Sequence, residues 1–399
     1  MLIIKVLLFK TSFYFCDSLI LVKMKKISLL VLVAIFILSC SEKSEQKKST
    51  NHVANEIEYA KNFELYTYPN FKILKITKPW QQATTSLTYV LAKNLAIVPD
   101  SLKTEKIIQI PVQKTISTST THIPSYEMLG QVDALIGFPH LDYISSEKVR
   151  SRINSNLVKE VGESENLNTE VIIELSPDLI IGYGMDSSNK ALDNLNKMGI
   201  AVIYNADWTE QTPLGKAEWI KFFGALFDKN DLANSIFKEI VTEYDTLKNL
   251  AKTAKNKPDV FSGGLYQDTW YAPKGTSWGS IFIEDAHANY IWKNTTGDGS
   301  IAISIEQALN EAKNTPIWIN PSSFESLADL KNNSKHNLEF DAYKTGEIYS
   351  FSMKKGQSGG SIYYELAPNR PDLVLKDLIK ILHPELLPDY KLYFYEKLK

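Results

Sequence analysis

The sequence predicts an α/β protein in which two αβ lobes are joined by a single helix. Short apolar runs alternate with helix-like segments between residues 114 and 206, and again between residues 259 and 382. Between these two series, residues 229–257 carry apolar side chains at intervals of about four and three residues, which is typical of an amphipathic helix. Pro258 ends the pattern. Alternating strands and helices form mostly parallel sheets, and the loops at the strands' carboxyl ends form a crevice. We therefore expect a ligand cleft between the lobes.

The first series defines the N-terminal lobe, which we expect to span residues 58–228. It opens with an antiparallel hairpin, because residues from Tyr59 onward alternate between apolar and polar types. Gly130 and Gly199 close two helix-like segments as C-terminal caps. The strands expected in this series lie at 114–117, 134–138, 157–162, 178–184 and 201–206.

The second series defines the C-terminal lobe, expected at residues 258–399. It combines short apolar runs with three helical stretches, the last of which begins at Pro371. Strands are expected at 259–266, 316–320 and 347–352, and helices at 278–292, 304–314 and 371–382.

The N-terminal region has the layout of a secretory signal. The basic residues Lys25 and Lys26 precede an apolar run, 27–38, that is shorter than the ~20 residues needed to cross a bilayer. The run ends in "ILSC", which looks like a bacterial lipobox, so Cys40 is expected to become the lipidated first residue of the mature chain. We therefore interpret residues 1–40 as a signal region that starts at Met24, and the polar residues 41–57 as a flexible tether.

Composition limits the classes of partner. The formal net charge is −2 and 23% of residues are charged, so no basic surplus indicates nucleic-acid binding. Both cysteines, Cys16 and Cys40, precede Ser41, and stability is therefore expected to come from packing instead of disulfides. The chain contains 20 Tyr and 7 Trp residues, which suit surfaces that bind flat or amphipathic ligands.

Two matched phrases carry a family resemblance. Each phrase predicts a helix, then a helix-breaking segment that contains Pro, and then a strand. The phrases are "NLNTEVIIELSPDLIIGYG" in the first lobe and "SIEQALNEAKNTPIWIN" in the second. With "YYELAPNRPDLVLKDLIKIL" near the C-terminus, residues 58–399 resemble the iron-complex and vitamin B12 (class III) periplasmic substrate-binding proteins of ABC importers. In that family a single rigid helix ties the lobes together.

The resemblance implies a function without covalent chemistry. It implies a monomeric binding protein, with no cofactor of its own, on the periplasmic side of a bacterial membrane. Such a protein delivers a siderophore, haem or a cobalamin-like corrinoid to an ABC permease and its ATPase.

The resemblance also implies that aromatic side chains in strand-end loops stack on a large planar or hydrophobic ligand. We expect Trp270 and Tyr271 in a loop facing Gly275, and His122 in the loop after the first strand of the series. By residue type alone, Trp208 and Trp270 could equally belong to the core. The histidines show no HxH or HxxxH spacing, so no metal site is expected. The expected ligand contacts are His122, Tyr183, Trp208, Trp270, Tyr271, Tyr363 and Tyr364.

Glu170 and Glu306 open helices at equivalent places in the two lobes. By resemblance, the pair protrudes toward arginine pockets on the permease. The alternative is that each carboxylate only complements the positive end of its own helix.

Other patterns leave two further classes of function open. The "GTSWG" stretch matches the G-x-S-x-G pattern of serine hydrolases, in which Ser277 would be the nucleophile. Asp285 and His383 follow in the order that a catalytic triad requires. The alternative is that Ser277 caps a helix that begins at Trp278. A haem or metal carrier without a permease would use His122 and Tyr183 as axial ligands. A dinucleotide fingerprint is disfavoured, because Ser187 replaces its third glycine.

Overall fold

The structure is a computed structural model that describes residues 53–399 except 164–165, 186 and 298. The predicted signal region with Cys40, and the tether up to residue 52, lie outside the described residues. In the part of the chain that is described, no helix combines the length and apolar character needed to cross a membrane.

An N-terminal sheet of four strands precedes the first parallel sheet. Its strands follow the chain in the order β1-β2-β3-β4; the first three are antiparallel, as predicted for a hairpin, and β4 joins parallel to β3. Alternate residues such as Phe63 and Leu65 are buried, so one face of the sheet joins the core of the lobe. The strands are β1 (Phe63–Thr67), β2 (Phe71–Ile76), β3 (Leu87–Ala92) and β4 (Lys106–Gln109).

Two carboxylates anchor the segment that enters this sheet. The carboxylate of Glu218, which is wholly buried, accepts hydrogen bonds from the backbone amides of residues 58–60 and from Lys221 Nζ at 2.8 Å. Glu210 accepts from the amides of residues 61 and 62. A buried charge is tolerated when its oxygens are this fully bonded.

The N-terminal lobe is built on a parallel sheet in the order β11-β10-β5-β6-β7. Every residue of the interior strand β10 is buried, as expected where helices cover both faces of a parallel sheet. The strands are β5 (Thr115–Ser117), β6 (Leu135–Phe138), β7 (Lys159–Glu160), β10 (Leu179–Gly182) and β11 (Val202–Tyr204), with a separate pair β8 (Gly162–Glu163) and β9 (Asn166–Leu167). The helices are α2 (Ile123–Met128), α3 (Glu147–Asn154), α4 (Thr169–Leu175), α5 (Lys190–Lys197), α6 (Pro213–Ala217) and α7 (Ile220–Leu226).

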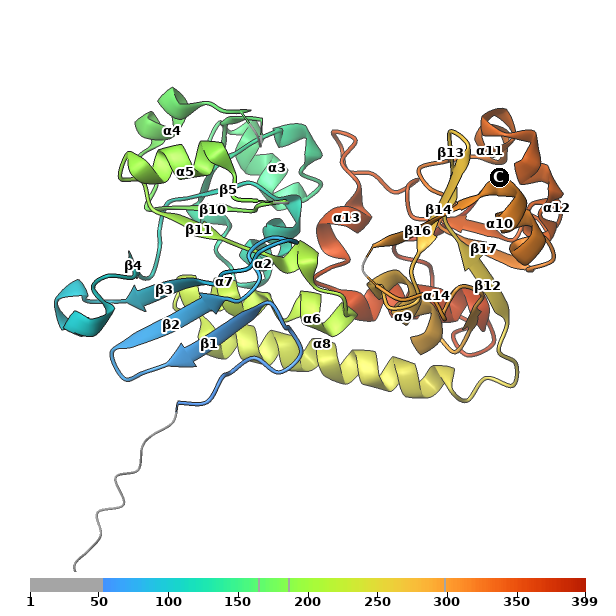
Figure 1. The fold of residues 1–399 in the computed structure, drawn as a ribbon, viewed down its shortest axis with the longest axis horizontal. Coiled ribbons are helices and arrows are strands. Elements are labelled where there is room, and N and C mark those ends of the chain that lie inside the picture. Colours follow the sequence, from blue (N-terminus) through green and yellow to red (C-terminus); the bar gives the residue numbers. More distant parts are fainter. Residues whose placement is uncertain (1–52, 164–165, 186, 298) are drawn as a thin grey trace, which may run out of the picture. The chain divides into compact units, whose positions relative to one another are not determined.

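Helix α8 (Asn230–Ala251) belongs to both lobes. Phe237 and Ile240, in its first part, pack in the core of the N-terminal lobe, whereas Tyr244 and Leu247 pack in the core of the C-terminal lobe. Figure 1 shows the helix running beneath both lobes. It stops six residues before the end of the stretch predicted as helical, 229–257.

The C-terminal lobe repeats the αβ pattern. Its main sheet has the order β15-β12-β17-β18-β19, with only β19 antiparallel. The helix predicted over 278–292 ends at Asp285, and a short strand, β15, follows. The strands of this sheet are β12 (Asp259–Ser262), β15 (Asn289–Tyr290), β17 (Ile317–Ile319), β18 (Ile348–Ser350) and β19 (Glu396–Lys397). The helices are α9 (Trp278–Asp285), α10 (Ile305–Ala312), α11 (Leu327–Asn333), α12 (Asp341–Thr345), α13 (Ile362–Leu366) and α14 (Pro371–Leu382).

A second, antiparallel sheet in this lobe is not predicted by the sequence. Its order is β13-β14-β16, formed by β13 (Gly264–Tyr266), β14 (Thr269–Pro273) and β16 (Ser300–Ser304). Otherwise the architecture confirms the predicted fold class of two αβ lobes with mostly parallel sheets.

Candidate binding site between the lobes

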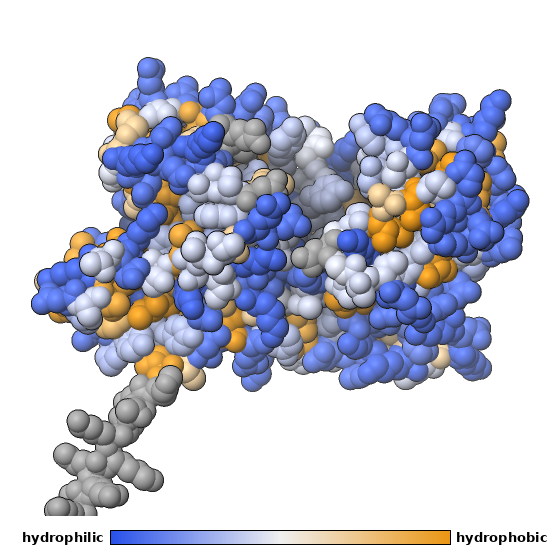
Figure 2. Space-filling model, in the orientation of Figure 1, coloured by the Kyte–Doolittle hydropathy of each residue, from blue (hydrophilic) through white to orange (hydrophobic). Residues whose placement is uncertain are grey.

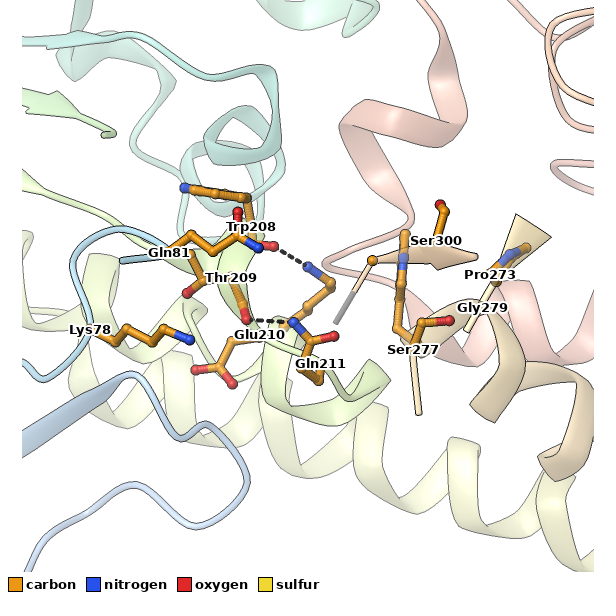
Figure 3. Close-up of a pocket in the computed structure, with 13 residues that line it drawn as sticks. Lys78, Gln81, Trp208, Thr209, Glu210, Gln211, Pro273, Ser277, Gly279 and Ser300 are labelled. Carbon is orange, nitrogen blue, oxygen red and sulfur yellow. Dashed lines mark hydrogen bonds between the residues drawn. The ribbon is translucent and has the colours of Figure 1, made fainter. Parts of the chain in front are cut away.

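A pocket of about 370 Å³, which we call the cleft pocket, is lined by residues of both lobes. Figure 2 shows that this face of the molecule is mainly hydrophilic and is hollowed between the lobes. In Figure 3, Trp208 and Gln81 lie on one side of the pocket, and Pro273, Ser277 and Ser300 lie on the other. The lining residues are Lys78, Gln81, Trp208, Thr209, Glu210, Gln211, Lys216, Pro273, Ser277, Trp278, Gly279, Gly299 and Ser300.

Two tryptophans, one from each lobe, supply the aromatic surface of the pocket. Trp208 lies in a 3-10 turn (Asp207–Thr209) that follows β11, and Trp278 is the first residue of α9. Both side chains are half-buried. The indole Nε1 of Trp208 is buried and has no hydrogen-bond partner among the described residues, although a buried indole N–H usually has one.

Lys216 connects the two tryptophans. It lies on α6 and is only 8% exposed, and its Nζ donates to the carbonyls of Asp207 at 3.1 Å and Trp208 at 3.2 Å. The same nitrogen lies 5.1 Å from the centre of the Trp278 ring, within the range of a cation–π contact. Burial lowers the pKa of Lys216, and the nearby carboxylates of Asp207 and Glu210 oppose that shift.

On another side of the cleft the lobes touch directly. We call residues 354–361 of the C-terminal lobe the interlobe turn. The Ser358 hydroxyl donates to the Asp142 carbonyl at 2.7 Å. A Cβ added at Gly356 would lie 2.7 Å from Ser145 Cα, and one added at Gly360 would collide with the Tyr143 carbonyl. Neither glycine has a positive φ, so the approach of the other lobe is what requires them.

Helix α13 adds polar contacts between the lobes, and Figure 1 shows it lying between them. Asn369, just after this helix, donates through Nδ2 to the Thr121 carbonyl at 2.8 Å and accepts from Ser125 Oγ at 3.0 Å. The carboxylate of Glu365, which is 5% exposed, accepts from the Ser145 amide at 2.6 Å.

The structure places four of the expected aromatic contacts at accessible positions. Trp208 lines the cleft pocket. Tyr271 is 44% exposed on β14 and Tyr364 is 60% exposed on α13, while Tyr183 is half-buried directly after β10. These three tyrosines are not among the residues that line the cleft pocket, and their contact with a ligand stays a prediction.

The expectation that Trp270 contacts the ligand is wrong. Trp270 lies within β14 instead of a loop and is wholly buried, with Nε1–H donating to the Ser262 carbonyl at 3.2 Å. Its ring packs against Phe261 and Trp318. Because side chains alternate along a strand, Trp270 faces the core while its neighbour Tyr271 faces outward.

His122 and Tyr363 are also core residues, contrary to expectation. The His122 ring is wholly buried against Phe223, its Nδ1 lies 2.6 Å from Ser117 Oγ, and burial lowers its pKa. Tyr363 is 4% exposed and stacks on Phe351 with ring centres 3.8 Å apart. A buried imidazole cannot serve as an axial ligand in the cleft, so the carrier alternative loses its proposed histidine.

The hydrolase alternative also fails on geometry. The Ser277 hydroxyl donates to the Lys274 carbonyl at 2.7 Å, and His383 Nε2 donates to the Ala286 carbonyl at 3.0 Å. Asp285 accepts from the Tyr244 hydroxyl at 2.7 Å. Each member of the supposed triad is therefore bonded elsewhere. Ser277 occupies the N-cap position of α9, but its side chain does not cap the helix as expected.

The two glutamates of the docking prediction occupy matching positions. Glu170 is the second residue of α4 and Glu306 the second residue of α10, and both side chains are exposed. The helices are capped alike, by the side chains of Asn168 and Ser304. Bonds at the start of its own helix lower the pKa of Glu306, which also agrees with the helix-end alternative. The docking role stays a prediction.

Trp208 is the only lining residue of the cleft pocket that was predicted as a ligand contact, and those not predicted include Lys78, Gln81, Lys216 and Trp278. Trp278 could have been suspected, because it begins a predicted helix at a strand-to-helix loop. Lys78 and Gln81 come from the loop after β2, which is far along the sequence from the strand ends of the parallel sheets, and no local signal marks them. As for metals, the described residues hold no group of three or more His, Cys, Asp or Glu side chains that could bind an ion.

Comparison with known proteins identifies the family. A family profile described as "Periplasmic binding protein" matches residues 116–352. The chain belongs to this family, the iron-complex and vitamin B12 class of periplasmic substrate-binding proteins.

Relatives and solved structures extend this similarity. An uncharacterized lipoprotein of Methanocaldococcus jannaschii is 28% identical over 372 residues, which cover 88% of this chain and 87% of the relative. The fold resembles that of a possible iron-binding, periplasmic solute-binding protein from Staphylococcus epidermidis (20% identity, TM-score 0.52, 68% of this chain and 99% of the other). It also resembles a periplasmic haem-binding protein from Pseudomonas aeruginosa (16% identity, TM-score 0.54, 72% and 98%).

Glu365 is expected to make stability depend on pH. Burial raises its pKa from 4.5 to about 7, against the opposing effect of hydrogen bonds from the amides of Ser145 and Ser146, and Glu127 adds to the rise. Because the folded pKa is the higher one, the stabilisation is complete below pH 4.5 and is lost as the pH rises through about 7.

Glu365→Gln keeps an acceptor for the amides but cannot ionise. Relative to the parent, its free energy of unfolding should therefore rise between pH 5 and pH 8 by at most about 3 kcal/mol. Urea unfolding at several pH values measures this, with the exposed Glu147→Gln as the control. Parallel pH profiles for the parent and Glu365→Gln would contradict the assignment.

Proposed function

We propose that the protein is the lipid-anchored substrate-binding protein of an ABC importer. It holds an iron complex (a siderophore or haem) or a cobalamin-like corrinoid between its lobes and delivers it to a membrane permease. The observation that carries the proposal is the cleft pocket, which takes Trp208 from one lobe and Trp278 from the other in a chain of the periplasmic binding protein family.

The chemistry of the pocket suits such ligands. Indole rings offer flat apolar surfaces to a macrocycle or a chelate, and the carboxamide of Gln81 offers a hydrogen-bond donor to its oxygen atoms. A volume of about 370 Å³ is at the low end for ligand sites, so a large chelate extends beyond the pocket or separates the lobes. The iron- and haem-binding descriptions of proteins with the same fold support this ligand class.

The lipid anchor and the permease complete the proposal. A relative that covers most of the chain is named a lipoprotein, which supports lipidation at Cys40. The matched, exposed Glu170 and Glu306 support docking on a permease, because charge-assisted Glu–Arg bonds suit a transient interface.

Trp208→Ala should weaken ligand binding at least tenfold, because it removes one aromatic wall of the pocket. The measurement is quenching of tryptophan fluorescence during titration with haem, cyanocobalamin and ferric siderophores. Tyr266→Ala removes an aromatic residue that is 67% exposed and outside the pocket, and it should bind like the parent. Equal affinities for all three proteins would show that the ligand binds elsewhere.

Cys40→Ala should leave the protein without lipid, since the acylated thiol is removed. Incorporation of labelled palmitate in cells provides the measurement. Cys16→Ala is the matched control and should be labelled normally. Label retained in the Cys40→Ala protein would refute the anchor.

Reversing both glutamates, Glu170→Lys with Glu306→Lys, should reduce ligand uptake by host cells sharply. Like charges at a complementary interface cost several kcal/mol, whereas losing a favourable helix-end charge costs only ~0.3–1 kcal/mol of stability. Ligand affinity should not change. Glu174→Lys, an exposed charge reversal on the same helix α4, serves as the control. Normal uptake with a lower melting temperature would favour the helix-end alternative.

A further inference from the structure

The loop between β2 and β3, residues 77–86, connects the N-terminal sheet to the cleft. It precedes the part of the chain that matches the family profile, residues 116–352. Two of its residues, Lys78 and Gln81, nevertheless line the cleft pocket. A segment outside the matched region therefore contributes to the site where the lobes meet.

Contacts with the parallel sheet hold this loop in position. The ring of Trp80 meets that of Tyr204, the last residue of β11, edge to face with centres 5.8 Å apart. Trp80 also lies against Gly184, where an added Cβ would be 3.2 Å from its ring. The backbone N–H of Gln81 donates to the Met185 carbonyl at 3.1 Å. The loop is thus fixed at the carboxyl ends of β10 and β11.

This anchoring decides where the neighbouring side chains point. Lys78 and Gln81 flank Trp80 in the sequence, and Figure 3 shows both side chains directed from the loop toward the segment that carries Trp208 and Glu210. An ammonium and a carboxamide are hydrogen-bond donors, and they complement oxygen atoms such as carboxylates or amide carbonyls. The tryptophan rings, by contrast, accept any flat apolar surface.

We infer that the 77–86 loop determines specificity: Lys78 and Gln81 select among ligands of the cleft pocket by the oxygen-bearing groups on the ligand's rim. Trp80 is the positioning residue that holds them there. This inference rests on the proposed function, because it assigns a role at the same pocket. It adds separate roles for two parts of the chain: the lobes with the parallel sheets bind the core of the ligand, and the loop of the N-terminal sheet contacts the groups on its rim.

The test compares affinities for three probes that differ at the rim. Haem carries carboxylates, cyanocobalamin carries carboxamides, and the tris(acetohydroxamate) complex of ferric iron presents neither at its rim. Dissociation constants are measured for the full chain and for Gln81→Ala, Lys78→Met and Trp80→Ala. Gln82→Ala is the matched control, because Gln82 is the adjacent exposed glutamine of the same loop and does not line the pocket.

We expect Gln81→Ala and Lys78→Met to change the ratio of affinities between the probes about tenfold, as expected for losing a hydrogen bond to a charged or polar rim group. Trp80→Ala should shift the ratio of affinities in the same direction as these two variants, whereas a general loss of structure would weaken the binding of all probes alike. Gln82→Ala should leave the ratio unchanged. Melting temperatures establish that each variant is folded.

The outcomes separate the two proposals. If the parent binds a probe and Trp208→Ala loses it, but the loop variants keep the parental ratios, the role of the loop is refuted and the proposed function stands. If the parent binds a probe and Trp208→Ala binds it equally well, the cleft pocket is not the site and the loop inference is overturned with it. If the parent binds none of the probes, the proposed ligand class is wrong, and the loop inference that rests on it is overturned as well.

Discussion

Helix α8 is the constraint on which the two-lobed architecture depends. Its first part is buried in one core through Phe237 and Ile240, and its second part in the other through Tyr244 and Leu247. Bending the helix between these parts would expose apolar side chains in at least one lobe, and both cores oppose that exposure. A cleft above such a helix is therefore expected to open by small movements of loops and lobes instead of a wide hinge motion.

The two sides of the cleft have different physical character. At the interlobe turn the lobes meet through backbone groups, two glycines and the buried carboxyl of Glu365, beside a second pocket of about 490 Å³ that residues of both lobes line. At the cleft pocket they meet through long side chains, with Lys216 between a carbonyl pair of one lobe and the Trp278 ring of the other. Side chains can rearrange around a ligand more readily than packed backbone, so the cleft pocket is the more adaptable of the two places.

Glu210 links the N-terminal sheet to the pocket. It lines the cleft pocket and also accepts the amides of residues 61 and 62 as the chain enters the sheet. Burial raises the pKa of Glu210, and these amide bonds together with that from Trp219 oppose the rise. The position of the sheet, and with it that of the 77–86 loop, is thus tied to the same carboxylate that borders the ligand space. A ligand that alters the surroundings of Glu210 acts on both.

The sequence by itself determined the α/β class, the two lobes, the long helix and the loop that holds Trp208, because periodicity and Gly or Pro breakers are local properties of the chain. Tertiary structure decided which aromatic residues face the cleft. Trp270 and Tyr271 are adjacent, and the pleat of an unpredicted strand sends one into the core and the other outward. It also brought Gln81 to the pocket, because packing of Trp80 on Tyr204 and the hydrogen bond from Gln81 to Met185 hold a loop of the N-terminal sheet at the ends of a distant sheet. Contacts between residues far apart in the chain leave no periodic trace in the sequence.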